Sequence, residues 1–171
     1  MALEKQEKLQ GISKALVDNG SLSTDDIQKY IAKARIKNIS LAKYLIDNKI
    51  ISGLSITLIV SKDFGVPMID INYIDNELMP LTLISDKLIQ RHNVIPLFKR
   101  GDNLYIGLED PSIQTSLKEI QFHTGLNTHG IVIEADKLAI HIDQMLNKKE
   151  RQALGDYLDD SSDLDNLEIS N

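Results

Sequence analysis

The sequence predicts an α+β protein: an N-terminal four-helix unit of two repeated helical hairpins, then a small mixed-sheet α/β subdomain in the order helix-strand-strand-helix-strand-helix. Two observations support this fold class. The stretch KALVDNGSLS at residues 14–23 nearly recurs as KYLIDNKIIS at residues 43–52. Beyond residue 66, the helical spacing of apolar residues gives way to short apolar runs bounded by turn residues, which is typical of strands.

The repeat lies within residues 1–66, which we expect to form the helical repeat subdomain. Ser23, followed by Asp26 three positions later, is typical of a helix N-terminus, and Ser52 stands at the corresponding place in the second copy. Each copy is therefore predicted to be a helix, a sharp Asp-Asn turn, a capping serine and a second helix. One such hairpin cannot cover its own apolar stripe, so the packing of two copies is a sufficient reason for the repeat.

Residues 67–147 form the predicted α/β subdomain. After a first helix, the strand-like runs VIPLFKR and NLYIGLE are joined by Gly101-Asp102, which indicates a hairpin. Asp110-Pro111 is typical of a helix start, because the carboxylate accepts free N–H groups and proline lacks a donor that is not needed there. HGIVIEA is the third strand, and Asp136 opens the last helix.

Residues 148–171 are predicted to be an acidic, flexible linker or tail. From residue 152 onward there are six acidic residues and no basic one, whereas the rest of the chain has 19 acidic and 19 basic residues. A body without net charge exerts no general attraction on nucleic acid or on an anionic membrane. We therefore expect no nucleic-acid partner, and no run of apolar residues is long enough for direct membrane insertion. The chain is expected to be cytoplasmic.

The sequence contains no recognisable catalytic motif. A phosphate-binding Walker A loop, a dinucleotide-binding G-x-G-x-x-G, a nucleophile elbow and an H-E-x-x-H pair are all absent, and there is no cysteine. The four histidines show no metal-ligand spacing. We therefore expect no catalytic residue, no metal site and no enzymatic activity in this chain.

The run HNVIPLFKRGDNLYIGLEDPSIQTSLKEIQFHTGL, residues 92–126, resembles the N-terminal region of type II secretion and type IV pilus assembly ATPases. LQGISKALVDNGSLS, which precedes it, resembles the pilus extension ATPases in particular. The resemblance implies a non-catalytic regulatory module that is linked to a hexameric ATPase domain absent from this chain. It also implies that ATP and magnesium belong to that motor domain, and that this chain has no cofactor of its own.

In some relatives, each copy of the doubled helical segment grips one half of cyclic di-GMP through a pattern close to R-L-G-x-x-L-V-x-x-G. Aligned on that pattern, this chain keeps the apolar positions and loses the polar ones. The arginine positions hold Gly11 and Ser40, the first glycine positions hold Ser13 and Ala42, and the last glycine positions hold Gly20 and Lys49. At about 1–3 kcal/mol for each lost charge-assisted contact, direct binding is expected to be weakened several hundredfold or more. A degenerate cyclic di-GMP sensor remains the alternative.

The resemblance further implies protein partners: a PilZ-type adaptor and the inner-membrane platform of the pilus machine, which would hold the chain at the membrane periphery. A partner surface needs exposed apolar residues with a polar rim. The first helix has more apolar positions than one narrow stripe requires, which predicts an interface at Leu9, Ile12, Leu16 and Val17. The alternative, that all four belong to the core, is equally compatible with the sequence.

Overall fold

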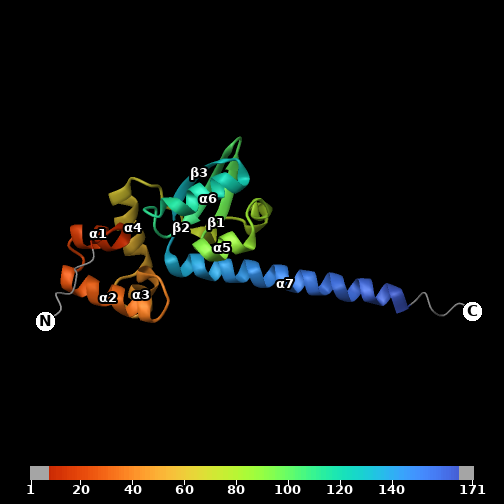
Figure 1. The fold of residues 1–171 in the computed structure, drawn as a ribbon, viewed down its shortest axis with the longest axis horizontal. Helices are drawn as coiled ribbons and strands as arrows, with labels where there is room; N and C mark the ends of the chain where they lie inside the picture. The colour runs from red at the N-terminus through yellow and green to blue at the C-terminus, as the bar shows by residue number, and fades with distance from the viewer. Residues whose placement is uncertain (1–7, 166–171) are drawn as a thin grey trace, which may run out of the picture.

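The computed structural model describes residues 8–165, with side chains for residues 8–154. A group of four helices lies to one side of a small sheet, and a long final helix runs past the sheet and continues beyond it (Figure 1). The predicted α+β class is confirmed, as is the order of the elements after the helical unit.

The helical unit consists of α1 (Gly11–Asp18), α2 (Thr24–Ile36), α3 (Leu41–Asp47) and α4 (Gly53–Phe64). Both predicted caps are confirmed. Ser23 Oγ accepts the N–H of Asp26 at 3.1 Å, and Ser52 Oγ accepts the N–H of Ser55 at 3.2 Å. Each serine satisfies one N–H group that the helix start leaves without an intrahelical partner, which stabilises a helix by about 1 kcal/mol.

The two copies of the repeat bury equivalent residues and turn at equivalent residues. Leu16 in α1 and Leu45 in α3 stand 29 positions apart, and both side chains are 0% exposed. After these helices the backbone is left-handed at Gly20 (φ +77°) and at Lys49 (φ +55°). The two copies of the repeat therefore match in the residues that they bury and in the positions where the backbone is left-handed.

The sheet contains β1 (Ile95–Arg100), β2 (Asn103–Leu108) and β3 (Asn127–Val132), in the order β1-β2-β3. The β1–β2 pair is an antiparallel hairpin, as predicted, and β3 runs parallel to β2. Three 3₁₀ turns, η1 (Ile71–Tyr73), η2 (Asn76–Leu78) and η3 (Leu81–Leu83), lead from α4 to α5 (Asp86–His92). The remaining helices are α6 (Gln114–Thr124), between β2 and β3, and α7 (Ala135–Asp165), after β3.

Two apolar clusters form the core. One lies between the sheet and its helices and includes Ile95, Leu97, Ile106, Ile120 and Leu138. The other fills the helical unit but also takes in Val132, at the end of β3, and Ala135, at the start of α7. Because the helical core extends into the sheet subdomain, the boundary predicted at residue 66 stays a prediction.

The predicted helix start at Asp110-Pro111 is wrong. The segment forms a turn in which Asp110 Oδ1 accepts the N–H of Ser112 at 2.9 Å, and α6 begins only at Gln114. The second carboxylate oxygen of Asp110 accepts the N–H of Ile12 in α1 at 3.3 Å.

Residues 148–165, which belong to the predicted acidic, flexible linker or tail, are helical, because α7 continues to Asp165. Residues 148–154, KKERQAL, are mostly strong helix formers and include neither glycine nor proline. Lys149 Nζ also lies 2.5 Å from Asp86 Oδ1, which ties this part of α7 to the start of α5. Residues 166–171 of the predicted tail lie outside the described residues.

Among residues 8–165, no helix combines the length and the apolar character that crossing a bilayer requires.

The equivalent burial of Leu16 and Leu45 predicts that both copies of the repeat support the same core. Replacing either leucine with alanine is expected to lower the free energy of unfolding by about 2–5 kcal/mol, because a buried cavity replaces the side chain. Urea unfolding followed by circular dichroism measures this change. Lys33→Ala, at an exposed position of α2, is the control and should change stability by about 0.5 kcal/mol or less.

Candidate functional site

Four carboxylates gather at one edge of the sheet. The parallel strands β2 and β3 end side by side at Leu108 and Val132. Glu109 and Asp110 follow β2, and Glu134 and Asp136 follow β3. All four lie against the beginnings of helices in the helical unit, as the contacts below establish. This edge, which we call the carboxylate edge (Glu109, Asp110, Glu134, Asp136), is the candidate functional site.

Asp110 holds the start of α1. Its Oδ2 accepts the Ile12 N–H at 3.3 Å, and a Cβ atom at Gly11 would lie only 2.4 Å from the same oxygen. Gly11 also has a left-handed φ of +55°. Two independent constraints, the backbone conformation and the close approach of Asp110, therefore require glycine at this position.

Glu109 holds the start of α3. Ser40, the N-cap of α3, donates its hydroxyl to Glu109 Oε2 at 3.1 Å and accepts the N–H of Lys43 at 3.1 Å. The Glu109 carboxyl faces a cavity of about 250 Å³, and none of the residues lining it is a lysine, an arginine or a histidine. The lining residues are Gln10, Ile12, Ser13, Ile31, Ser40, Leu41, Ala42, Glu109, Asp110 and Ile113.

Burial governs the ionisation of Glu109. Although the residue is partly exposed as a whole, its carboxyl is surrounded by protein, and this desolvation raises its pKa to about 7. The hydrogen bond from Ser40 opposes the rise, and the nearby charge of Asp110 adds to it. Glu109 therefore changes its charge near neutral pH, unlike an exposed glutamate.

Glu134 and Asp136 lie against the start of α4. A Cβ atom at Gly53, the first residue of α4, would lie 2.8 Å from Asp136 Oδ1 and 3.1 Å from Glu134 Oε2. Asp136 Oδ1 is buried and accepts no hydrogen bond from the described residues. A carboxylate placed at a helix N-terminus is favoured by the partial positive charge there. Gly53 is thus a second glycine that leaves room for a carboxylate.

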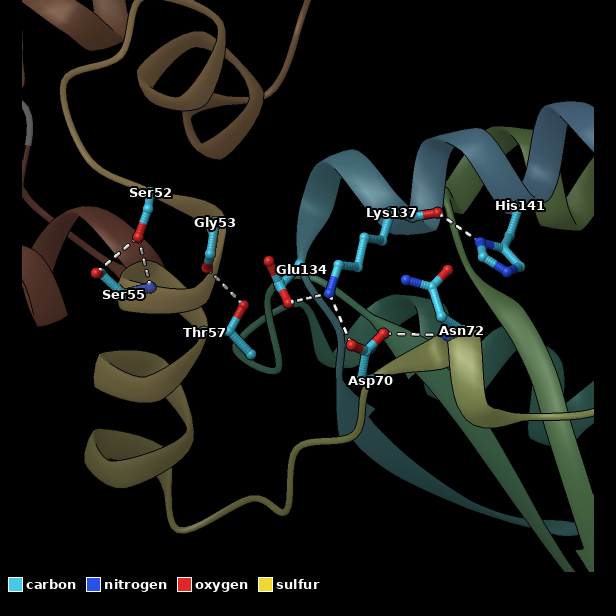
Figure 2. A network of polar contacts seen from close by, with 9 residues as sticks. All are labelled: Ser52, Gly53, Ser55, Thr57, Asp70, Asn72, Glu134, Lys137 and His141. Carbon is cyan, nitrogen blue, oxygen red and sulfur yellow. Dashed lines mark hydrogen bonds and ion pairs between the residues drawn. The ribbon is translucent and has the colours of Figure 1, made fainter.

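Lys137 connects this part of the edge to the sheet subdomain (Figure 2). Its Nζ lies 2.7 Å from Glu134 Oε1 and 2.8 Å from Asp70 Oδ2. The hydrogen bond from Lys137 is the main reason that the pKa of Asp70 is lowered, and the bonds to Asp70 and Glu134 raise the pKa of Lys137. Glu134 is therefore charge-compensated, whereas Glu109 is not.

The structure brings together part of the predicted cyclic di-GMP positions. Ser13, Ser40 and Ala42 line the cavity beside Glu109, and Gly11 lies against Asp110. Gly20 and Lys49 lie beyond the opposite ends of α1 and α3 and do not line it. The first-turn positions thus face carboxylates, and no lysine, arginine or histidine among the described residues lines the cavity to compensate a phosphate.

The structure corrects the predicted partner interface. Ile12 and Leu16 are 5% and 0% exposed and belong to the core of the helical unit, because α1 packs against α4 with this face. Leu9 and Val17 are partly buried at the edge of the same core. These residues therefore cannot form a continuous exposed surface.

The carboxylate edge was missed in the sequence, although a signal was present. The β2 run ends in Leu108-Glu109-Asp110, and the β3 run ends in Glu134-Ala135-Asp136 after two apolar residues. Acidic residues directly after two parallel strands are expected to meet at one edge of the sheet. Among residues 8–154, whose side chains the structure describes, no group of three or more histidine, aspartate or glutamate side chains is placed to hold a metal ion.

Comparison with known proteins identifies relatives of this chain. Residues 64–152 match the MshEN domain family. The type IV pilus assembly ATPase PilB of Pseudomonas aeruginosa is 36% identical over 162 residues, which cover 95% of this chain and 28% of that protein. PilB of Acinetobacter baylyi is 34% identical over 131 residues, covering 77% of this chain and 23% of that protein. The chain thus spans about a quarter of the length of these relatives.

Two solved structures share the fold. The structure of MshE with cdg (cyclic di-GMP) has a TM-score of 0.58 and 16% identity, and the match covers 80% of this chain and 99% of that one. The N-terminal domain of XpsE has a TM-score of 0.57 and 16% identity, with 80% and 97% covered. At this identity, the likeness shows a common fold.

The close approach of Asp110 to Gly11 can be measured with a pair of glycine substitutions. Gly11→Ala and Gly20→Ala both place a side chain at a positive φ, but only at Gly11 does the new Cβ meet another atom within 4 Å. Each should cost about 1 kcal/mol for the backbone. Gly11→Ala should cost about 1–3 kcal/mol more, because it displaces a hydrogen bond to a charged group. Equal losses in urea unfolding would show that the Asp110 contact contributes nothing.

Proposed function

The chain belongs to the MshEN domain family and corresponds to the N-terminal region of type IV pilus and type II secretion ATPases, and on this premise we propose that it is a non-catalytic interaction module of a type IV pilus assembly motor. In this role it docks a PilZ-type adaptor or a platform protein and links that partner to the hexameric ATPase domain. ATP and magnesium are used by that domain, and the partners hold the module at the inner membrane.

One observation supports a protein partner over a nucleotide: carboxylates face the first turns of both repeats, where cyclic di-GMP binding would require cations. Cyclic di-GMP carries two phosphates. A carboxylate about 4 Å from a phosphate raises the energy by about 4 kcal/mol at an effective dielectric constant near 20. Glu109 and Asp110 line this cavity, and no basic residue lines it.

The size of the cavity supports the same conclusion. Sites for small molecules typically enclose about 300–1,000 Å³. The cavity beside Glu109 has about 250 Å³ and is bounded by apolar side chains that the helical core requires. The cavity is thus smaller than the space that a ligand of dinucleotide size typically occupies.

For the docking surface we propose the outer face of α4. Leu54 and Leu58 are one helical turn apart, and their side chains are 49% and 52% exposed. Neighbouring exposed apolar residues on a helix suit a protein partner that covers them. This surface replaces the one predicted on α1, whose central residues are buried.

A degenerate cyclic di-GMP sensor is the second candidate, since the solved structure of MshE with cyclic di-GMP shares this fold. Two features of this chain oppose it: the lack of arginine at positions 11 and 40, and the carboxylates of Glu109 and Asp110 beside the cavity.

Calorimetric titration with cyclic di-GMP separates the two candidates. No binding tighter than about 100 μM is expected, because neither phosphate meets a compensating cation. Micromolar or tighter binding would instead establish the sensor. ATP should likewise produce no turnover with this chain.

Docking on α4 can be tested with the purified PilZ-type adaptor of the parent bacterium. The double substitution Leu54→Asp and Leu58→Asp should weaken adaptor binding by at least about tenfold, since it puts charges into an apolar contact. Ile36→Asp, at an exposed apolar position of α2, is the matched control and should leave the affinity unchanged. If both variants bind as tightly as the unmodified chain, the adaptor uses another surface.

A further inference from the structure

We propose that Glu109 and Asp110 form a proton-dependent clamp between the helical unit and the sheet subdomain, closed when Glu109 is protonated and loosened when Glu109 is ionised. This inference does not depend on which partner the module docks. It concerns how the two parts of the chain are held together.

The clamp consists of two hydrogen bonds between segments distant in the sequence. Ser40 Oγ donates to Glu109, 69 positions away, and the Ile12 N–H donates to Asp110, 98 positions away. One two-residue segment therefore reaches the first turns of both repeats. If it moves away, α1 and α3 lose these contacts together.

The other side of the boundary provides a pivot. Val132 and Ala135 are buried within the helical core, and Met68 pairs with Val132 as an extra strand residue. The Ile69 N–H also donates to the Val132 carbonyl at 3.1 Å. These contacts are apolar or backbone contacts and do not change with pH. Loosening is therefore confined to the β2 side, where the clamp lies.

The surroundings of Glu109 make its charge unfavourable in the closed state. From α1, α2 and α3, only uncharged residues line the cavity, and Asp110 is the one other ionisable group among its lining residues. Glu134 and Asp136, the remaining carboxylates of this edge, lie beside α4, where Lys137 compensates Glu134. Among the described residues, no lysine, arginine or histidine lines the cavity to relieve an ionised Glu109.

The direction of the effect follows from linkage. Burial raises the pKa of Glu109 to about 7 in the closed state, from 4.5 for an exposed glutamate. The stabilisation of the closed state is complete below about pH 4.5 and is lost as the pH rises through about 7. Across this window, the ratio of closed to open molecules should fall by up to about 300-fold.

The absence of cysteine in the chain permits a direct distance measurement. Lys33→Cys on α2 and Lys118→Cys on α6 place spin labels at exposed positions, one on each side of the clamp. Double electron–electron resonance should give one narrow distance at pH 5.5 and a broader or longer distribution at pH 8.5. Identical distributions at the two pH values would overturn the proposal.

Two further variants assign the response to Glu109. In the labelled chain, Glu109→Gln keeps the hydrogen-bond acceptor but cannot ionise, so the pH 5.5 distribution should persist at pH 8.5. Glu77→Gln, at an exposed position outside the carboxylate edge, should respond as the unmodified chain does. If Glu109→Gln still broadens at pH 8.5, a different group drives the change. Circular dichroism at both pH values verifies that each variant is folded.

Discussion

Carboxylates at the ends of two parallel strands hold the helical unit against the sheet, and several features of the chain follow from that constraint. Asp110 and Asp136 occupy the space that a side chain would need at Gly11 and Gly53. Glu109 accepts the hydroxyl of Ser40, so a small polar residue suits that cap. The carboxylates that follow the strands thus limit which residues can stand at the starts of the repeat helices.

The same constraint explains why the two copies of the repeat keep their apolar positions while their first turns hold small residues. The apolar positions are needed for a core that both copies share, as the equal burial of Leu16 and Leu45 shows. The residues in the first turns of α1 and α3 are instead constrained by the carboxylates that lie opposite them. An arginine at position 11 would meet Asp110 first, and the resulting internal ion pair would compete with any phosphate for its charge. In the helical unit, the residues that maintain the fold are therefore different from the first-turn residues that would decide ligand binding.

Local rules predicted the local structure. Capping serines, helical spacing and the Gly101 turn each depend on residues close in the sequence, and the elements they predict are present. The same rules failed where a side chain acts over a distance. The sequence predicts that Asp110 caps the helix that follows it. One of its carboxylate oxygens instead accepts a hydrogen bond from the N–H of Ile12, 98 positions away. The helical spacing of apolar residues likewise could not show whether Ile12 belongs to the core or to an interface. An apolar stripe on a helix does not reveal how many other elements of the same chain pack against it.

Because α7 begins at the carboxylate edge, the contacts at this edge also determine where that long helix starts. Ala135 begins the helix inside the helical core, and Lys137, two residues later, binds Asp70 of the sheet subdomain. The first turn of α7 is therefore fixed by both parts of the molecule. The whole of α7 is 31 residues long, about 46 Å at 1.5 Å per residue, and its C-terminal part continues beyond the sheet (Figure 1). Because α7 starts at the pivot, a change of only a few degrees between the two parts would displace its far end by several ångströms.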